Sequence, residues 1–189
     1  MKKKALLLIL ILCSYTAIAQ EPAGLIVKTN LLNLLAKRPT LSVEKTFSDL
    51  YGLEIAYTFG EIKNLGYRDY YQYDGFLLRA KKYTRPIKNR EANAFYGVYF
   101  GNLNKTIVSH GTVDNTGFFS FGNDRDFKAN SLRYGGTFGV SFIPKQHFLL
   151  EGLTGLGYGN YFNVQNNLKS KTPNGYFDFQ LWLSIGYSF

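Results

Sequence analysis

The clearest alternation of apolar and polar residues lies at the C-terminus, in the segment Tyr176-Phe177-Asp178-Phe179-Gln180-Leu181-Trp182-Leu183-Ser184-Ile185-Gly186-Tyr187-Ser188-Phe189. Every odd-numbered position in it is apolar, whereas the even-numbered positions include Asp178, Gln180, Ser184 and Ser188. Because successive side chains of a β-strand point to opposite faces, this period of two predicts a strand with one apolar face.

Seven further segments alternate in the same way, and turn-forming residues separate them. Together the segments fall near 24–34, 39–48, 51–60, 74–85, 92–103, 130–143, 147–160 and 176–189. No stretch keeps a helical period over three turns. The pattern predicts an all-β fold, a closed antiparallel up-and-down β-barrel of about eight strands. The count would rise to ten if the longest connection paired with itself.

Charges of both signs recur on the polar faces, near strand centres. We predict that they form an ion-pair network in the lumen, made of Lys28, Glu44, Glu54, Arg79, Lys81, Arg133 and Glu151. The alternative, a gated polar pathway, is less favoured because an eight-stranded barrel leaves internal space only for side chains. The network is therefore interpreted as a plug that fixes the register.

The apolar faces are predicted to meet lipid. They carry many Phe and Tyr residues near strand ends, as in membrane girdles, while the polar faces hold glycines such as Gly135 and Gly157 that suit a crowded lumen. Closure follows because an unpaired amide in hydrocarbon costs several kcal/mol. A soluble, lipocalin-like ligand-binding barrel of the periplasm is the alternative, with the aromatic face inside.

The N-terminus has the form of a cleaved signal peptide. Lys2, Lys3 and Lys4 precede a short apolar core, and Ala17-Ile18-Ala19 provides the small residues needed for cleavage. The sequence thus predicts a signal peptide over 1–19, a barrel domain over 20–189 and an outer-membrane location. Lipidation at Cys13, the single cysteine, is disfavoured because Leu12 replaces the small residue expected before it.

Connection lengths predict the orientation. With both termini in the periplasm, the short connections near 48–50, 86–91 and 144–146 face inward, and the long ones near 61–73, 104–129 and 161–175 face outward. The 104–129 loop contains Phe118-Phe119-Ser120-Phe121, an apolar run that suits contact with a surface partner or with lipid. The cluster Asp124-Arg125-Asp126 in the same loop is interpreted as solvated charge.

Composition excludes several function classes. Removing the three signal lysines lowers the formal charge from +9 to +6, and the remaining basic residues are scattered, which argues against nucleic-acid binding. Outer-membrane lipid and lipopolysaccharide are the expected surroundings of a monomer. Two distant histidines and no mature cysteine make no metal-ligand spacing, and no cofactor is expected.

Enzymatic activity is not expected. The alternative is a lipid-A-modifying enzyme, whose deacylase type needs a His-x-Ser pair that neither His110 nor His147 provides. Ser141, His147 and Glu151 share the inward face on neighbouring segments, so a triad is conceivable there. At the periplasmic end of a lumen, a buried polar network is the favoured interpretation of these residues.

Two stretches resemble known proteins. The end of the chain, with Tyr187 and Phe189, is similar to the terminal strand that the barrel-assembly machinery reads in outer-membrane barrels. Lys28-Thr29-Asn30-Leu31-Leu32 and Pro39-Thr40-Leu41-Ser42-Val43-Glu44 resemble the opening hairpin of a domain-of-unknown-function family of small Gram-negative barrels of the OmpA/OmpX type. The resemblance implies a fold and a location, and no activity.

Overall fold

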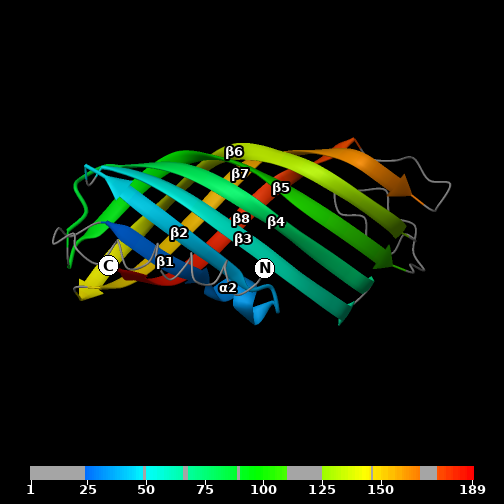
Figure 1. Cartoon of the computed structure of the whole chain (residues 1–189), viewed down its shortest axis with the longest axis horizontal. Coiled ribbons are helices and arrows are strands. Elements are labelled where there is room, and N and C mark those ends of the chain that lie inside the picture. The colour runs from blue at the N-terminus through cyan, green and yellow to red at the C-terminus, as the bar shows by residue number, and fades with distance from the viewer. Residues whose placement is uncertain are drawn as a thin grey trace, which may run out of the picture.

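The computed structural model describes residues 24–48, 50–65, 68–88, 90–109, 125–145, 147–166 and 174–189. Within them the strands are β1 (Leu25–Asn30), β2 (Thr40–Phe47), β3 (Tyr51–Leu65), β4 (Arg68–Tyr83), β5 (Ala92–Ser109), β6 (Arg125–Lys145), β7 (Phe148–Asn166) and β8 (Gly175–Ser188). A short helix, α2 (Leu31–Leu35), follows β1. The strands form a closed antiparallel barrel in chain order, so the predicted eight-stranded barrel is confirmed (Figure 1).

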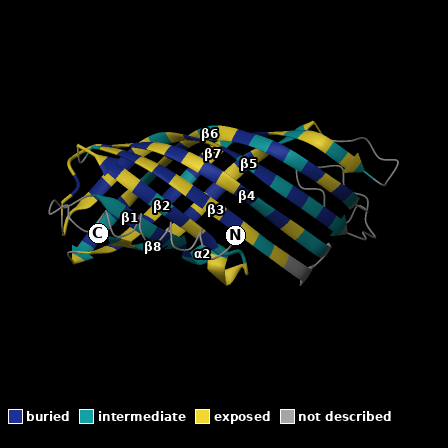
Figure 2. Cartoon of the chain, viewed as in Figure 1, coloured by how far each residue is buried: buried dark blue, intermediate teal, exposed yellow. Residues whose placement is uncertain are grey.

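The two faces of the wall differ as the alternation predicts. Figure 2 shows buried and exposed residues alternating along the strands. The exposed positions are largely apolar, for example Val98, Phe138 and Phe179. All seven charged residues of the predicted network are buried, at 8% exposure or less. The barrel is therefore polar inside and apolar outside, the reverse of a soluble protein.

Strand pairing in the wall is incomplete at the barrel end opposite the turn between β2 and β3. β1 pairs with β8 only from Ile26 with Ser188 to Asn30 with Ser184. Further along, β8 from Gly175 to Leu183 pairs with β7, and no strand of the described residues pairs with its other edge. Helix α2 lies in this region and packs against β8. Strand pairing alone thus leaves a short break in the wall between β8 and β3.

The predicted first strand, 24–34, is wrong in its second half. The chain leaves the sheet at Asn30, whose side-chain oxygen accepts hydrogen bonds from the backbone N–H groups of Leu32 (3.0 Å) and Asn33 (3.4 Å). This cap satisfies donors that a helix start leaves unpaired, so α2 forms where the second half of the strand was expected. Among the described residues, no helix has the length and apolar character needed to cross a membrane.

The predicted outer loops are too long. β3 and β4 continue through 61–73 and leave only residues 66–67 between them. β5 and β6 likewise enter the predicted 104–129 loop, and β7 enters the 161–175 loop. Residues 110–124, with Phe118-Phe119-Ser120-Phe121 and Asp124, lie outside the described residues, as does the predicted signal peptide, 1–19.

An inversion of polarity explains these missed strand ends. Near the ends of β5 and β6, Ile107, Phe127 and Ala129 are buried inside the barrel, while Lys128 is exposed on its outside. This is the pattern of a sheet whose outer face meets water. The alternation with a polar inner face therefore ends where the strands leave the apolar band, and the predicted strands end there too.

Candidate functional site

The centre of the lumen holds two lysines among three glutamates. Lys28 Nζ lies 2.6 Å from Glu44 Oε2, 2.7 Å from Glu54 Oε2 and 3.0 Å from Glu151 Oε1. Lys81 Nζ lies 2.8, 2.7 and 2.8 Å from carboxylate oxygens of the same three residues. All five side chains are at most 1% exposed. Each ammonium therefore bridges strands on different sides of the barrel.

Arg79 balances the charge of this group, which we call the lumen core and which consists of Lys28, Glu44, Glu54, Arg79, Lys81 and Glu151. Its Nη1 donates to Glu54 Oε1 at 2.7 Å, and its Nη2 donates to Gln180 Oε1 at 3.2 Å. The guanidinium also lies 4.5 Å from the ring centre of Trp182. Three cations thus face three carboxylates. Such neutrality is needed, since a buried charge is tolerated only when it is paired and hydrogen-bonded.

The lumen core is an unsuitable place for a metal ion. Ligand oxygens of Glu44, Glu54 and Glu151 lie within 4.8 Å of one another, close enough to hold one. Lys28 and Lys81 already donate to all three carboxylates, however, and Tyr83 donates its hydroxyl to Glu44 Oε1 at 2.5 Å. A cation would have to displace two buried ammonium groups, so the chemistry of this cluster is internal ion pairing.

Arg133 is joined to the lumen core indirectly, through Asp178, Gln180 and Arg79. Its Nη1 lies 3.9 Å from Asp178 Oδ1, and no ion pair joins it to the described glutamates of the core. Asp178 Oδ2 accepts hydrogen bonds from Tyr99 Oη and Gln180 Nε2, each at 2.9 Å. The alternation of the sequence predicted the correct face of β6 for Arg133. It does not show how far along the barrel axis each inward side chain lies, and therefore which side chains meet.

Two glycines on facing strands make room for this second group. Gly135 on β6 pairs with Gly157 on β7, and both face Tyr99. A Cβ atom at Gly135 would lie 2.7 Å from the Tyr99 hydroxyl oxygen, and one at Gly157 would collide with it. The glycines therefore let a large aromatic side chain cross the lumen and reach Asp178, as the prediction of a crowded interior requires.

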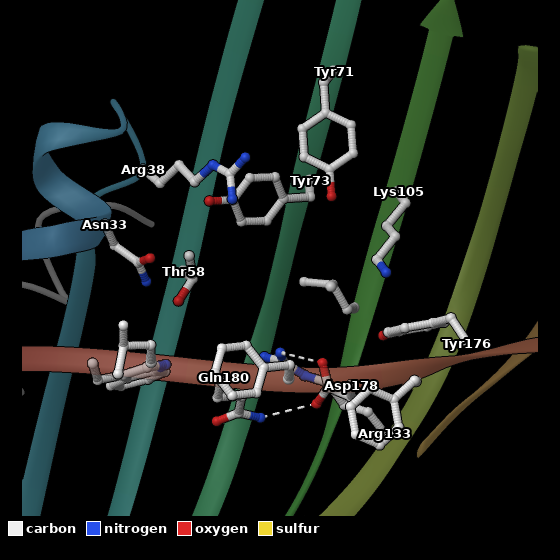
Figure 3. A pocket seen from close by; sticks show the side chains of 15 residues that line it. Asn33, Arg38, Thr58, Tyr71, Tyr73, Lys105, Arg133, Tyr176, Asp178 and Gln180 are labelled. Atoms are coloured by element: carbon white, nitrogen blue, oxygen red, sulfur yellow. Dashed lines mark hydrogen bonds and ion pairs between the residues drawn. The ribbon is translucent and has the colours of Figure 1, made fainter. Parts of the chain in front are cut away.

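A cavity of about 470 Å³ adjoins this group (Figure 3). Its walls come from α2, β3, β4, β5, β6, β8 and the link after α2. The lining residues are Asn33, Arg38, Thr58, Tyr71, Tyr73, Leu103, Lys105, Arg133, Tyr176, Phe177, Asp178, Phe179, Gln180, Leu181 and Trp182. Three of them are cations and one is a carboxylate.

Aromatic rings hold two of the cations at the cavity. The Arg38 guanidinium lies 4.8 Å from the ring centre of Tyr73 and 5.3 Å from that of Tyr71. Lys105 Nζ lies 3.2 Å from the ring centre of Tyr176. These contacts orient the two cations at the cavity.

The conceivable triad is not assembled. His147 is exposed in the turn before β7, where its Nδ1 lies 2.7 Å from the carbonyl oxygen of Ser188. Ser141 Oγ donates to the Asn93 carbonyl at 3.3 Å, and Glu151 belongs to the lumen core. The expectation that His147 and Glu151 share an inward strand face is wrong, because the strand begins only at Phe148.

The C-terminal aromatic residues lie on the outside of the barrel. Tyr187 stacks on the His147 ring, with 5.1 Å between ring centres, and packs edge-on against Phe189 at 4.9 Å.

The sequence did not point to the other residues that contact the lumen core and the cavity, namely Arg38, Tyr83, Tyr99, Asp178, Gln180 and Trp182. The last three were on the polar face of the C-terminal segment, which was the available signal.

The comparisons with known proteins agree with this architecture. The family described as Protein of unknown function (DUF3575) matches residues 5–177. The chain belongs to this family. No curated protein matches this DUF3575 chain. The crystal structure of Neisserial surface protein A is similar to it, with a TM-score of 0.54 and 14% sequence identity over 88% of this chain and 94% of the other. At that identity, the likeness shows the fold of this DUF3575 protein.

Proposed function

We propose that the protein is an integral outer-membrane β-barrel with a closed lumen and a structural or surface-interaction role. The observation that carries the proposal is the inverted polarity of the wall. Charged side chains are buried inside, while aliphatic and aromatic side chains cover the outside from Leu53 and Ile55 on β3 to Leu181 and Leu183 on β8. Such a surface is stable against hydrocarbon and would aggregate in water.

The lumen core supports a closed barrel. Six charged side chains from five strands meet at its centre, all at 2% exposure or less. Buried apolar residues fill more of the interior, including Ile26, Leu77, Phe95 and Leu149. An ion would need to break several short charged hydrogen bonds to pass. The proposed role is therefore carried by the outside and the exposed connections of the barrel.

Export, insertion and partners complete the proposal. The signal peptide over 1–19 directs export and is removed, and the terminal strand with Tyr187 and Phe189 is read by the barrel-assembly machinery. The monomer then lies among outer-membrane lipid and lipopolysaccharide. Its 104–129 segment is the proposed contact for a surface partner. We propose no catalytic activity, since Ser141, His147 and Glu151 have separate partners.

Gel mobility with and without boiling, on fractionated membranes, tests the proposal. We expect the protein only in detergent extracts of outer membrane, with a shift in mobility on boiling. Release by osmotic shock as a soluble protein without such a shift would instead support a periplasmic ligand-binding barrel. Altered lipid A on expression, abolished by His147→Ala, would support the enzyme alternative.

Protease treatment of intact cells tests the orientation. Cleavage within 104–129 on intact cells is expected, because this connection lies at the end opposite the β2–β3 turn. Cleavage that occurs only after lysis would place this end in the periplasm and overturn the proposed surface role.

A further inference from the structure

We infer that the cavity beside the lumen core binds an amphiphile with an anionic head group and an apolar chain. Arg38, Lys105 and Arg133 hold the head group, and the chain leaves past the unpaired edge of β8. The inference rests on the proposed membrane location only for the exit of the chain, because there the outer face of β8 meets hydrocarbon. The head-group site stands on the geometry of the cavity.

Charge is the first argument. The lumen core has three cations and three carboxylates, whereas the cavity lining has three cations and only Asp178 as a carboxylate. Lys105 has a further interaction of its own, so the count rests on Arg38 and Arg133 against Asp178, which leaves one surplus positive charge. In a partly enclosed space the attraction of this charge to an anion is stronger than in water. An anionic head group restores the balance that the lumen core already has.

Arg133 points to the ligand most directly. The residue is 8% exposed, and its distance to Asp178, 3.9 Å, exceeds hydrogen-bond range. Its Nε atom is buried without a hydrogen-bond partner, as are Arg38 Nε and, in the lumen core, Arg79 Nε. Arg79 differs from the other two because it donates through Nη1 and Nη2 to Glu54 and Gln180. Two guanidinium groups on one cavity therefore have donors without acceptors, a costly arrangement that an anionic ligand would relieve.

The lining of the cavity indicates the second part of the ligand, the apolar chain. This lining includes Asp178, Gln180 and Trp182 from the inner face of β8 and Phe177, Phe179 and Leu181 from the outer face. We therefore place the exit of the apolar chain along the edge between these two faces of β8. Over Gly175 to Leu183 no described strand pairs with that edge, which gives the chain a path to the outside of the barrel.

The outer end of this path is apolar. Phe177, Phe179 and Leu181 are 58, 60 and 57% exposed there. The cavity volume, about 470 Å³, falls among pockets that hold organic ligands rather than single inorganic ions. Figure 3 shows β8 crossing the site, with Arg38, Lys105 and Arg133 around the space beside it. An alkyl phosphate combines the matching charge with a chain for this path.

Trp182 provides the assay, because it is the only tryptophan of the chain and it lines the cavity. The purified full-length barrel, in nanodiscs of zwitterionic lipid, is titrated with decyl phosphate while Trp182 emission is recorded. We expect a saturable change. Arg38→Gln and Arg133→Gln should each weaken binding about tenfold, which corresponds to about 1.4 kcal/mol.

Matched variants and ligands separate the outcomes. Arg85→Gln and Lys128→Gln remove exposed cations outside the cavity and should bind as the unchanged protein does. Decanol and inorganic phosphate should each bind at least about tenfold more weakly than decyl phosphate. No saturable change, equal binding of decanol, equal binding of phosphate, or equal loss in the control variants would each overturn the inference. A retained mobility shift on boiling in every sample shows that such a failure concerns the site and not the barrel.

Discussion

Lys81 on β4 and Glu151 on β7 meet across the lumen, with 2.8 Å between Nζ and Oε2, although 70 residues separate them in the chain. Strand pairing joins only neighbours in the ring, whereas this contact joins two strands that are not paired with each other. Lys28 adds equivalent contacts from β1. The lumen core therefore ties the wall together from inside and makes the barrel sensitive to single changes there.

Lys28→Met should destabilise the barrel strongly. The change leaves three buried carboxylates facing only Lys81 and Arg79, so one negative charge loses its compensation. Breaking a buried ion pair in this way costs about 3–5 kcal/mol. Urea titration in lipid vesicles, followed by gel mobility without boiling, measures the free energy of unfolding. Lys45→Met, at an exposed position of the neighbouring β2, is the control, and an equal loss there would contradict the prediction.

Removing one charge of each sign should be less harmful than the single changes suggest. In Lys28→Met/Glu44→Gln the lumen core regains neutrality, so the double variant should be more stable than the sum of the two effects. We expect a coupling of about 0.5–3 kcal/mol, the range found for residues in one network. The same urea titrations give the four free energies. Strict additivity would show that the two side chains act independently.

An arginine on the outside of the barrel should destabilise it according to depth. Val98 lies on the outer face of β5 within the apolar band and is 64% exposed, whereas Thr106 lies further along the same strand among polar neighbours. Val98→Arg should cost about 2–4 kcal/mol and Thr106→Arg about 0–1 kcal/mol. Refolding into vesicles at increasing urea measures both. Equal effects would argue against a hydrocarbon layer around Val98.

A methyl group at Gly157 should disturb the lumen. The new Cβ atom would collide with the Tyr99 hydroxyl and with the backbone of β6. Overpacking of this kind costs about 1–3 kcal/mol. Gly152 is the control on the same strand, because a Cβ there has no neighbour within 4 Å. The Gly157→Ala variant should therefore have a lower melting temperature than the Gly152→Ala variant. Equal melting temperatures would contradict the prediction that the lumen is crowded at Gly157.

Planar bilayers containing the protein should show no discrete conductance steps, because the buried ion pairs of the lumen core join strands on different sides of the barrel. Simultaneous Glu44→Ala, Lys81→Ala and Glu151→Ala changes remove side chains without changing the pairing of the strands. They should raise the ion leak if the altered barrel still folds, which the mobility shift on boiling checks. Steady conductance by the unchanged protein would support the gated-pathway alternative.

The sequence by itself determined the closed antiparallel barrel, a count of about eight strands and the face on which most side chains of the predicted segments lie. These depend on local alternation, which is written in successive residues and does not require knowledge of distant contacts. The C-terminal segment 176–189 shows it most directly, and β8 follows it from Gly175 to Ser188. The alternation predicted the wrong structure after Asn30, where a helix cap ends the strand. It also missed the strand ends near Ile107 and Phe127, where the inner face of the barrel becomes apolar.

Only the tertiary structure decided which inward side chains meet. The stagger between strands sets their heights, so it brings Lys28, Lys81 and three glutamates together and leaves Arg133 beside Asp178. It also leaves part of one edge of β8, from Gly175 to Leu183, without a described strand paired to it and places Arg38, from the link after α2, at the same cavity. Such distances depend on closure of the whole ring, because each register adds to the next, and no single segment of the sequence contains that sum.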